Sequence, residues 1–201
     1  MQPISETNHP QPSASDRDPY KVPVFSLGNK ARRLVWNAVW LLLCSWTPRP
    51  AHFWRVWILR LFGAKIGRHN AIYPSARIWA PWLLRTEDTV TIGPGVEVYN
   101  PGGVYLGHHA IVSQNAYLCG ATHNYQSANF DFVQKEIIIE PYAWICARAV
   151  VLPGVTCGAG SVLGALSVTS RDLAEWTVYA GNPCSRIKAR NNFTTKGDGG
   201  T

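Results

Sequence analysis

One histidine, His123, has the sequence context of a catalytic base. It lies near the start of CGATHNYQSANFDFVQKEI, a polar and aromatic segment that does not fit the repeat pattern of the residues around it. A neutral imidazole has a pKa of about 6.5 and can take up a proton at physiological pH. Polar side chains close by in the sequence, Asn124, Gln114 and Asn115, are suited to lining a pocket. We therefore expect general-base chemistry at the base of a loop that leaves the main fold.

The residues around this segment repeat every six positions. From Ile139 the repeat continues without a slip through Ile145, Val151, Cys157 and Leu163, and all five are apolar. A period of six is neither helical nor that of a simple strand, and it is typical of a solenoid of short strands and tight turns. Three shorter runs upstream share the pattern: Ile66, Ile72 and Ile78; Ile92, Val98 and Val104; Leu106, Val112 and Leu118. A β-sandwich with frequent turns is the alternative, but five consecutive hexads favour an all-β solenoid.

Composition indicates one domain with appendages. The 201 residues are 46% hydrophobic, which is enough to form a core. We expect disordered tails at residues 1–20 and 191–201, a Trp-rich helical segment at 21–62, and the solenoid at 63–190 with a protruding loop at 124–136. Five cysteines without C-x-x-C spacing indicate neither a disulfide framework nor a zinc site. The polar N-terminus does not resemble a signal peptide, so we expect a cytoplasmic location.

The Trp-rich segment is basic as well as aromatic. The net charge is +7, and many of the cations lie on either side of this apolar stretch. They do not form the basic groove with exposed stacking residues that nucleic acid would need. A membrane surface is therefore favoured over nucleic acid as the partner of this charge. The run LVWNAVWLLLCSW has 13 residues, fewer than the roughly 20 that span a bilayer. Pro48 and Pro50 should divide the segment into two helices. Two roles stay open: a cap over the solenoid, and contact with the membrane interface.

Four stretches carry a resemblance to a known family: LFGAKIG from Leu61, THNY from Thr122, WICARAVVLPGVTCGAGSVLGALSV from Trp144, and YAGNPCSRIK from Tyr179. Over about residues 30 to 190 the chain resembles the hexapeptide-repeat acyltransferases, most closely the colanic-acid-biosynthesis-type O-acetyltransferases. The resemblance implies a left-handed parallel β-helix that forms a homotrimer with active sites between subunits. It also implies acetyl-CoA as the acyl donor, no metal, and a sugar hydroxyl as the acceptor in exopolysaccharide or other cell-surface glycan biosynthesis.

The resemblance further implies roles for single residues. His123 matches the catalytic base, and Ala147 matches the position whose backbone N–H stabilises the oxyanion. The positions that contact CoA are Trp144, Ala147, Ala165, Ser170, Arg171 and Lys188. Asn100 matches an acceptor-pocket position, and the loop adds Asn124 and Tyr125 as candidate acceptor contacts. Two departures concern CoA: Leu166 replaces a usual Gly, and Ser185 replaces a common Arg, which leaves the phosphates to Arg186 or Lys188.

Other functions stay open at this point. N-acetylation of an amino sugar would use the same donor and a similar base, and a non-catalytic trimeric scaffold would use neither. A zinc site built from His108, His109 and His123 is disfavoured, because adjacent histidines in a strand point to opposite faces. The Trp-rich basic segment favours a lipid-linked saccharide as acceptor and a peripheral position at the inner face of the cell membrane.

Overall fold

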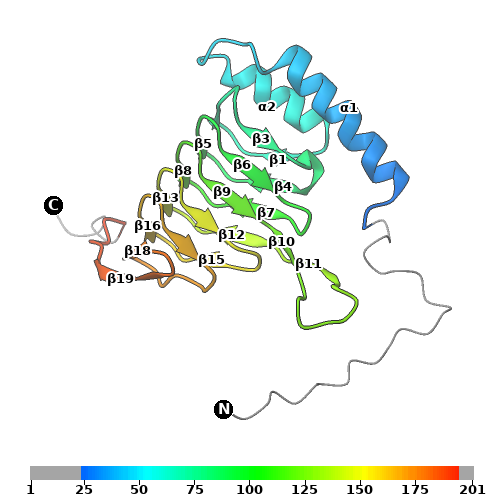
Figure 1. Cartoon of the computed structure of the whole chain (residues 1–201). Helices are drawn as coiled ribbons and strands as arrows, with labels where there is room; N and C mark the ends of the chain where they lie inside the picture. The colour runs from blue at the N-terminus through cyan, green and yellow to red at the C-terminus, as the bar shows by residue number, and fades with distance from the viewer. Residues whose placement is uncertain (1–23, 195–201) are drawn as a thin grey trace.

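The computed structural model describes residues 24–194, most of which form a three-sided parallel β-solenoid (Figure 1). The tail expected at 1–20 lies outside the described residues, as does the C-terminal tail beyond residue 194. Each short strand pairs in parallel with the strand one coil further on, so three sheets form the three sides. The predicted solenoid and its N-terminal helical segment are confirmed.

The sheets share one pattern, in which successive strands of a sheet come from successive coils. Sheet A contains β1 (Lys65–Ile66), β4 (Leu84–Thr86), β7 (Val104–Leu106), β12 (Ile137–Ile139) and β15 (Thr156–Cys157). Sheet B contains β2 (Ala71–Ile72), β5 (Thr91–Ile92), β8 (Ile111–Val112), β13 (Trp144–Ile145), β16 (Val162–Leu163), β18 (Thr177–Gly181) and the antiparallel end strand β19 (Cys184–Ala189). Sheet C contains β3 (Arg77–Ile78), β6 (Glu97–Tyr99), β9 (Tyr117–Cys119), β14 (Val150–Val151) and β17 (Val168–Thr169). We name the three corners the A–B, B–C and C–A edges.

The hexad positions form the core. Ile139 and the four later members of its run are all fully buried, as the period of six predicts. The upstream runs are separate because the sheet A strands β4 and β7 each bury two residues, such as Val104 and Leu106. Strand residues alternate between faces, so the second inward residue lengthens each early coil by two positions and shifts the repeat. Leu84 pairs with Val104 in an early coil, whereas Ile138 pairs with Thr156 in a late one.

Two helices cover the N-terminal end of the solenoid (Figure 1). They are α1 (Leu27–Leu43) and α2 (His52–Leu61), separated by the expected proline-containing turn. Trp36 of α1 is 1% exposed and donates its indole N–H to the Ile78 carbonyl oxygen at 2.6 Å. Ile58 and Leu59 of α2 join the same core. The helices therefore act as the cap that hides the first coil from water.

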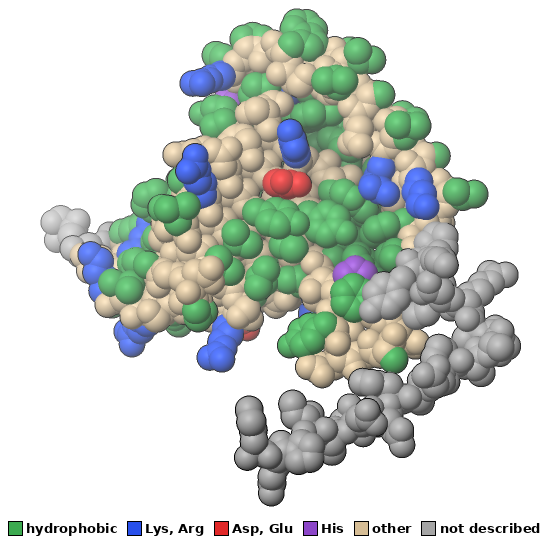
Figure 2. Space-filling model, in the orientation of Figure 1, with side chains coloured by type: hydrophobic (Ala, Val, Ile, Leu, Met, Phe, Trp, Pro, Cys, Tyr) green, Lys and Arg blue, Asp and Glu red, His purple; other side chains and the backbone are tan. Residues whose placement is uncertain are grey.

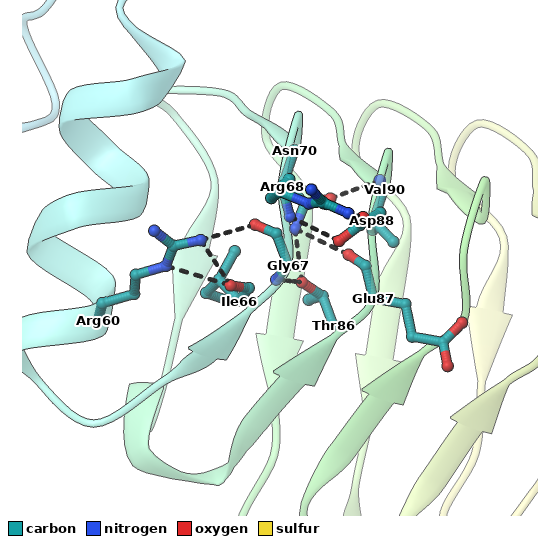
Figure 3. A network of polar contacts seen from close by, with 9 residues as sticks. All are labelled: Arg60, Ile66, Gly67, Arg68, Asn70, Thr86, Glu87, Asp88 and Val90. Atoms are coloured by element: carbon teal, nitrogen blue, oxygen red, sulfur yellow. Dashed lines mark hydrogen bonds and ion pairs between the residues drawn. The ribbon is translucent and has the colours of Figure 1, made fainter.

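Arg60 binds α2 to the first coil through backbone carbonyl groups. The guanidinium of Arg60 donates to the carbonyl oxygens of Ile66, at 2.7 and 3.1 Å, and of Gly67, at 2.9 Å (Figure 3). In the next turn Asn70 donates to Thr86 Oγ1 at 2.7 Å. Gly67 is required here, because an added Cβ would collide with the backbone of Glu87. These contacts fix the first two coils at the A–B edge.

Candidate active site

A β-hairpin interrupts the C–A edge after β9. Its strands are β10 (Ala121–His123) and β11 (Phe132–Gln134), which pair antiparallel with His123 opposite Phe132. The solenoid resumes at β12, where Ile137 pairs with Val104 of the preceding coil. The predicted protruding loop is therefore present as a hairpin that projects from the solenoid (Figure 1).

Two phenyl rings and one carbonyl group hold the His123 ring. The ring stacks on Phe130 with centroids 4.4 Å apart and meets the edge of Phe132 at 5.4 Å. Its Nδ1 lies 2.9 Å from the Phe130 carbonyl oxygen. A carbonyl oxygen only accepts hydrogen bonds, so Nδ1 carries the proton of the neutral ring. The lone pair is therefore on Nε2, which is the atom that can take a proton from a nucleophile.

The residues after His123 shape the outer part of the hairpin. Asn124 donates its backbone N–H to the Asp131 carbonyl oxygen at 2.8 Å, and its side-chain oxygen accepts from the Gln126 N–H at 3.2 Å. Tyr125 is 79% exposed. Ser127 donates to the Asp131 carboxylate at 2.7 Å. Polar side chains thus surround the tip of the hairpin, and Tyr125 is available to a ligand.

Asn100 lies below the hairpin and is fully buried. Its side-chain oxygen accepts from the Ala80 N–H at 3.0 Å, and its side-chain nitrogen donates to the Ala80 carbonyl oxygen at 2.9 Å. Both ends of the amide are used within the fold. The placement of Asn100 supports a role in joining two coils under the site, and it does not present the side chain to a ligand.

A second group of predicted site residues lies on sheet B and the B–C edge. Trp144 in β13 donates its indole N–H to Ser113 Oγ at 2.8 Å. Ala147 follows in the turn at the B–C edge, where its carbonyl oxygen accepts from the Leu166 N–H at 3.0 Å. The Ala147 N–H has no hydrogen-bond partner within residues 24–194. Ala165 occupies the equivalent turn of the next coil, and its neighbour Leu166 is 68% exposed with positive φ, so Leu166 points away from the coil.

The remaining predicted CoA contacts divide between two places. Ser170 and Arg171 are exposed at the C–A edge, and Ser170 lines a hollow of about 260 Å³ beneath the hairpin together with Thr122 and Lys135. Lys188 is exposed on β19 at the end of sheet B. Ser170 and Arg171 are therefore on the same edge as His123, whereas Lys188 is on the same sheet as Trp144.

Within one chain the two groups are separate. His123 projects from the C–A edge, and Ala147 lies at the B–C edge, with sheet C between them. The resemblance assigned these residues to one site between subunits, and a single subunit does not bring them together.

The residues that pack behind Phe132, a ring neighbour of His123, were not predicted. Phe25, just before α1, lies 5.3 Å from Phe132 and 5.0 Å from Trp79, and Arg33 of α1 stacks 4.5 Å from the Trp79 ring. These residues come from distant parts of the sequence and lie outside the hexad positions. No repeat or motif in the sequence signalled them.

The histidine pair His108 and His109 differs from expectation. Both lie in the turn after β7, and their Nδ1 atoms are 3.2 Å apart, so they do not point to opposite faces of a strand. The assumption that they sit in a strand was wrong, because Gly107 ends the pairing of β7 and His109 adopts a left-handed turn conformation. Across residues 24–194 no three histidine, cysteine or acidic side chains are placed to hold a metal ion.

The sequence is similar to those of known acetyltransferases. No protein-family model matches the sequence. The chain is 37% identical over 166 residues, which are 83% of its length and 91% of the relative's, to "Putative colanic acid biosynthesis acetyltransferase WcaF" of Escherichia coli (strain K12). It is 32% identical over 87 residues, 40% of its length and 41% of the relative's, to a galactoside O-acetyltransferase of Lactococcus lactis subsp. lactis (strain IL1403).

Solved structures share the fold. A hexapeptide-repeat acetyltransferase of Vibrio cholerae, VCA0836, superposes with a TM-score of 0.74 at 22% identity, covering 83% of this chain and 95% of that one. The same protein has also been solved with acetyl-CoA. A galactoside acetyltransferase in complex with coenzyme A superposes with a TM-score of 0.70 at 21% identity, covering 84% of this chain and 86% of that one.

Proposed function

The chain belongs to the colanic-acid-biosynthesis-type acetyltransferases, and from this membership we propose that it transfers an acetyl group from acetyl-CoA to a sugar hydroxyl. The pathway we propose is the synthesis of exopolysaccharide or another cell-surface glycan. The observation that carries the proposal is the fixed tautomer of His123, whose Nδ1 is held by the Phe130 carbonyl group. The galactoside O-acetyltransferase relative supports a saccharide acceptor, and the acetyl-CoA complex of the Vibrio cholerae protein supports the donor.

In the proposed reaction His123 Nε2 removes the proton of the sugar hydroxyl. The oxygen attacks the thioester carbonyl carbon, and a tetrahedral oxyanion forms. The C–S bond then breaks, the acetyl group stays on the sugar oxygen, and the departing thiolate takes the proton from the imidazolium. The Phe130 carbonyl group keeps the ring oriented throughout and stabilises its charged form.

The unpartnered Ala147 N–H is our candidate for the oxyanion donor. It lies in a surface turn between Cys146 and Arg148, and its own side chain is a single methyl group, which leaves room for a thioester. We assign Trp144 and Ala165 to the pantetheine arm, and Ser170, Arg171 and Lys188 to the nucleotide end of CoA, where cations favour phosphate. Asn124 and Tyr125 are our candidates for acceptor contacts, and Asn100 supports the edge beneath them.

We propose a homotrimer, because one subunit does not form a complete site. His123 is on the C–A edge and Ala147 on the B–C edge. Packing the C–A edge of one subunit against the B–C edge of its neighbour would bring the base and the oxyanion donor together. Such a head-to-tail contact closes into a ring when repeated by rotation.

We also propose that the helical cap contacts the cytoplasmic face of the membrane, where a lipid-linked saccharide would be presented. Neither helix in the described part of the chain is both long and apolar enough to cross a bilayer. Both helices nevertheless expose large apolar side chains, among them Leu27, Leu34, Phe53 and Trp57. Apolar side chains beside arginines are suited to the headgroup boundary of an anionic bilayer.

The proposal is tested by measuring free thiol released from acetyl-CoA with sugars, nucleotide sugars and lipid-linked oligosaccharides as acceptors. His123→Ala should lose about two to four powers of ten in acceptor-dependent rate, as expected for removal of a general base. His109→Ala, an exposed histidine at the A–B edge, is the matched control and should keep the rate. Release of the product's acetyl group by mild alkali distinguishes an O-acetyl ester from an N-acetyl amide. Wild-type turnover by His123→Ala would remove that residue from the mechanism.

A further inference from the structure

The hairpin that carries His123 contacts the helical cap as well as the solenoid. The His123 ring meets Phe132 at 5.4 Å, and Phe132 meets Phe25, two residues before α1, at 5.3 Å between ring centroids. These contacts place the imidazole within about 11 Å of the Phe25 ring. We propose that they fix the height of the active site above the bilayer, so that the enzyme acetylates the sugar units nearest the lipid of a lipid-linked oligosaccharide. This inference rests on the proposed transferase function and on the proposed membrane contact, and it specifies which part of the acceptor reacts.

The contact with Phe25 orients one face of the hairpin toward the cap. The hairpin leaves the solenoid after β9, two strands beyond β3 in sheet C. Strands of neighbouring coils are about 4.8 Å apart, so this level lies roughly 10 Å from the first coil. His123 and Phe132 are paired in register and therefore share one face of the hairpin. Because Phe25 contacts both Phe132 and the first-coil residue Trp79, that face is turned toward the cap.

Both cap helices present apolar side chains to solvent along one side. The exposed members are Leu27 and Leu34 on α1, and Phe53, Trp57 and Leu61 on α2. Intervals of four and seven residues place each set on one side of its helix. In Figure 2 hydrophobic side chains lie beside Lys and Arg side chains over the helical end of the molecule. The set on α1 begins two residues after Phe25, so the hairpin meets the cap at the margin of the proposed membrane face.

The proposed ring keeps the three caps at one end of the trimer. The C–A and B–C edges run along the solenoid, so subunits joined through them stand side by side around a common axis. Sheet C of each subunit turns toward that axis, and the end of each solenoid that carries the helices stays uncovered. One bilayer can therefore contact all three caps, and every His123 is then at the same height above it. Three linked contacts bind a bilayer more tightly than one.

This arrangement selects sugars by their distance from the lipid. A lipid-linked oligosaccharide has its phosphate linkage among the headgroups, and its sugars extend from there into water one after another. The hydroxyl that reacts must lie within hydrogen-bond distance of His123 Nε2. Since the His123 ring lies on the cap side of the hairpin, the units closest to the lipid meet that condition, and units further along the oligosaccharide lie beyond it. A polysaccharide released from its lipid is not held at this height and should be a poorer acceptor.

The test locates the acetyl group along acceptors whose units differ only in their distance from the lipid. The acceptors are homo-oligosaccharides, from trisaccharides to hexasaccharides, of glucose, galactose, mannose and each further sugar accepted in the thiol-release assay. Each is supplied free in solution and as a polyprenyl-diphosphate conjugate in vesicles of phosphatidylethanolamine and phosphatidylglycerol, and tandem mass spectrometry identifies the acetylated unit. On vesicles the units nearest the lipid should carry about ten times more acetyl than the distal units, whereas the free oligosaccharides should show no such preference.

Two variants separate the membrane contact from the hairpin contact. Leu34→Asn combined with Phe53→Asn changes only exposed cap residues, so it should lose the preference on vesicles and keep the wild-type rate on free oligosaccharides. Phe25→Ala removes the link between cap and hairpin, so it should bind vesicles as the wild type does but spread the acetyl group over more distant units. Ile187→Asn, an exposed apolar residue on β19 at the other end of the solenoid, is the matched control and should change neither.

The outcomes separate this inference from the proposed function. Transfer that is uniform along the oligosaccharides on vesicles, or strongest at the distal end, would overturn the inference and leave the reaction intact. The same preference in free and vesicle-bound acceptors would assign it to recognition of the end of the sugar chain and would also overturn the inference, as would a wild-type preference in Phe25→Ala. Absence of transfer from acetyl-CoA to every acceptor would contradict the proposed function itself.

Discussion

At position 147 the proposed chemistry needs a backbone N–H, and the side chain is secondary. The residues in register with Ala147 in the first two coils are Pro74 and Pro94, which occupy the same turn position. The next residue, Arg148, has a φ of 58°, as in a type II turn, which accepts proline at the preceding position. Ala147→Pro is therefore a substitution that removes the N–H and leaves the turn geometry unchanged.

Ala147→Pro should lower the rate of acetyl transfer by about two to three powers of ten, because loss of one oxyanion donor has an effect of that size. The thermal midpoint should stay near that of the wild type. Gln114→Pro, at the same turn position one coil earlier, is the control for folding and should keep the thermal midpoint of the wild type. Normal turnover by a folded Ala147→Pro protein would show that the oxyanion is stabilised elsewhere.

The residue scale also shows what the sequence could predict. His123 was identified because it interrupts a regular repeat, and the structure shows the feature that orients it, the Phe130 carbonyl group. That contact depends on the shape of a hairpin that has no repeat, so no periodicity predicts it. Asn100 looked like a ligand contact from its family position, yet its amide is used by Ala80 within the core. Burial of that kind follows from coil stacking, which the linear sequence does not show.

Among the elements, the turn that joins β4 to β5 carries an acid-sensitive contact. The Glu87 carboxylate accepts from the Tyr105 hydroxyl at 2.6 Å and from the His108 N–H at 2.8 Å, which binds the second coil to the third. These hydrogen bonds lower the Glu87 pKa below its ordinary value of 4.5. The bond from Tyr105 has the largest effect, and the bond from the His108 N–H has the next largest. Lowering the carboxylate pKa stabilises the fold above the unfolded-state value.

The stabilisation from Glu87 should therefore be complete above about pH 5 and should be lost as the pH falls through the lowered folded-state pKa. Glu87→Gln should unfold more readily at neutral pH and should show a weaker loss of stability on acidification, measured as urea midpoints from pH 7 to pH 3. Glu97→Gln is the control, because its carboxylate accepts no hydrogen bond within residues 24–194. An unchanged acid dependence in Glu87→Gln would contradict the assignment.

The two cap helices combine a packed face with an exposed apolar face. On α1, Trp36 is buried while Leu27 and Leu34, seven residues apart, are exposed. On α2, Ile58 is buried while Phe53 and Trp57, four residues apart, are exposed. Spacings of four and seven place each pair on one side of its helix. The sequence left the cap and the membrane contact as alternatives, and the buried and exposed faces allow both.

Replacing Leu34 and Phe53 together with Asn should lower binding to vesicles that contain anionic lipid by about tenfold or more, because each large apolar side chain contributes about 1.5–3 kcal/mol when it leaves water. Cosedimentation with vesicles gives the partition coefficient. Ile187→Asn, an exposed apolar residue on β19 at the other end of the solenoid, should have no effect. Equal binding by the Leu34 and Phe53 variant and the wild type would contradict membrane contact.

For the whole molecule, the fold was the most predictable property, because every coil repeats the same burial pattern. A coil whose pattern is weak is still identified from the coils before and after it. The two inward residues of β4 and β7 shift the repeat and divide the upstream hexads into three runs, but each run is still recognisable in the sequence. The arrangement of the site was less predictable. Residues that the resemblance assigns to one site, such as His123 and Ala147, lie on different edges of the three-sided solenoid. The resemblance to the acyltransferases implied a site between subunits, and the separation of these two residues is the reason why we propose a second copy to complete it.

This separation gives a test of the assembled protein. If the base comes from one subunit and the oxyanion donor from its neighbour, then His123→Ala and Ala147→Pro each inactivate every site in their own trimers. Mixed trimers, made by coexpressing the two variants with different affinity tags and purifying through both, contain some interfaces where an intact His123 meets an intact Ala147. Those trimers should recover a measurable part of wild-type thiol release. The control mixture combines the His123→Ala variant with a double variant that carries both changes. It contains no intact His123, so it has no complete interface and should stay inactive. If the first mixture stays inactive although purification through both tags shows that mixed assemblies formed and light scattering shows that they are trimers, both residues belong to the same subunit's site.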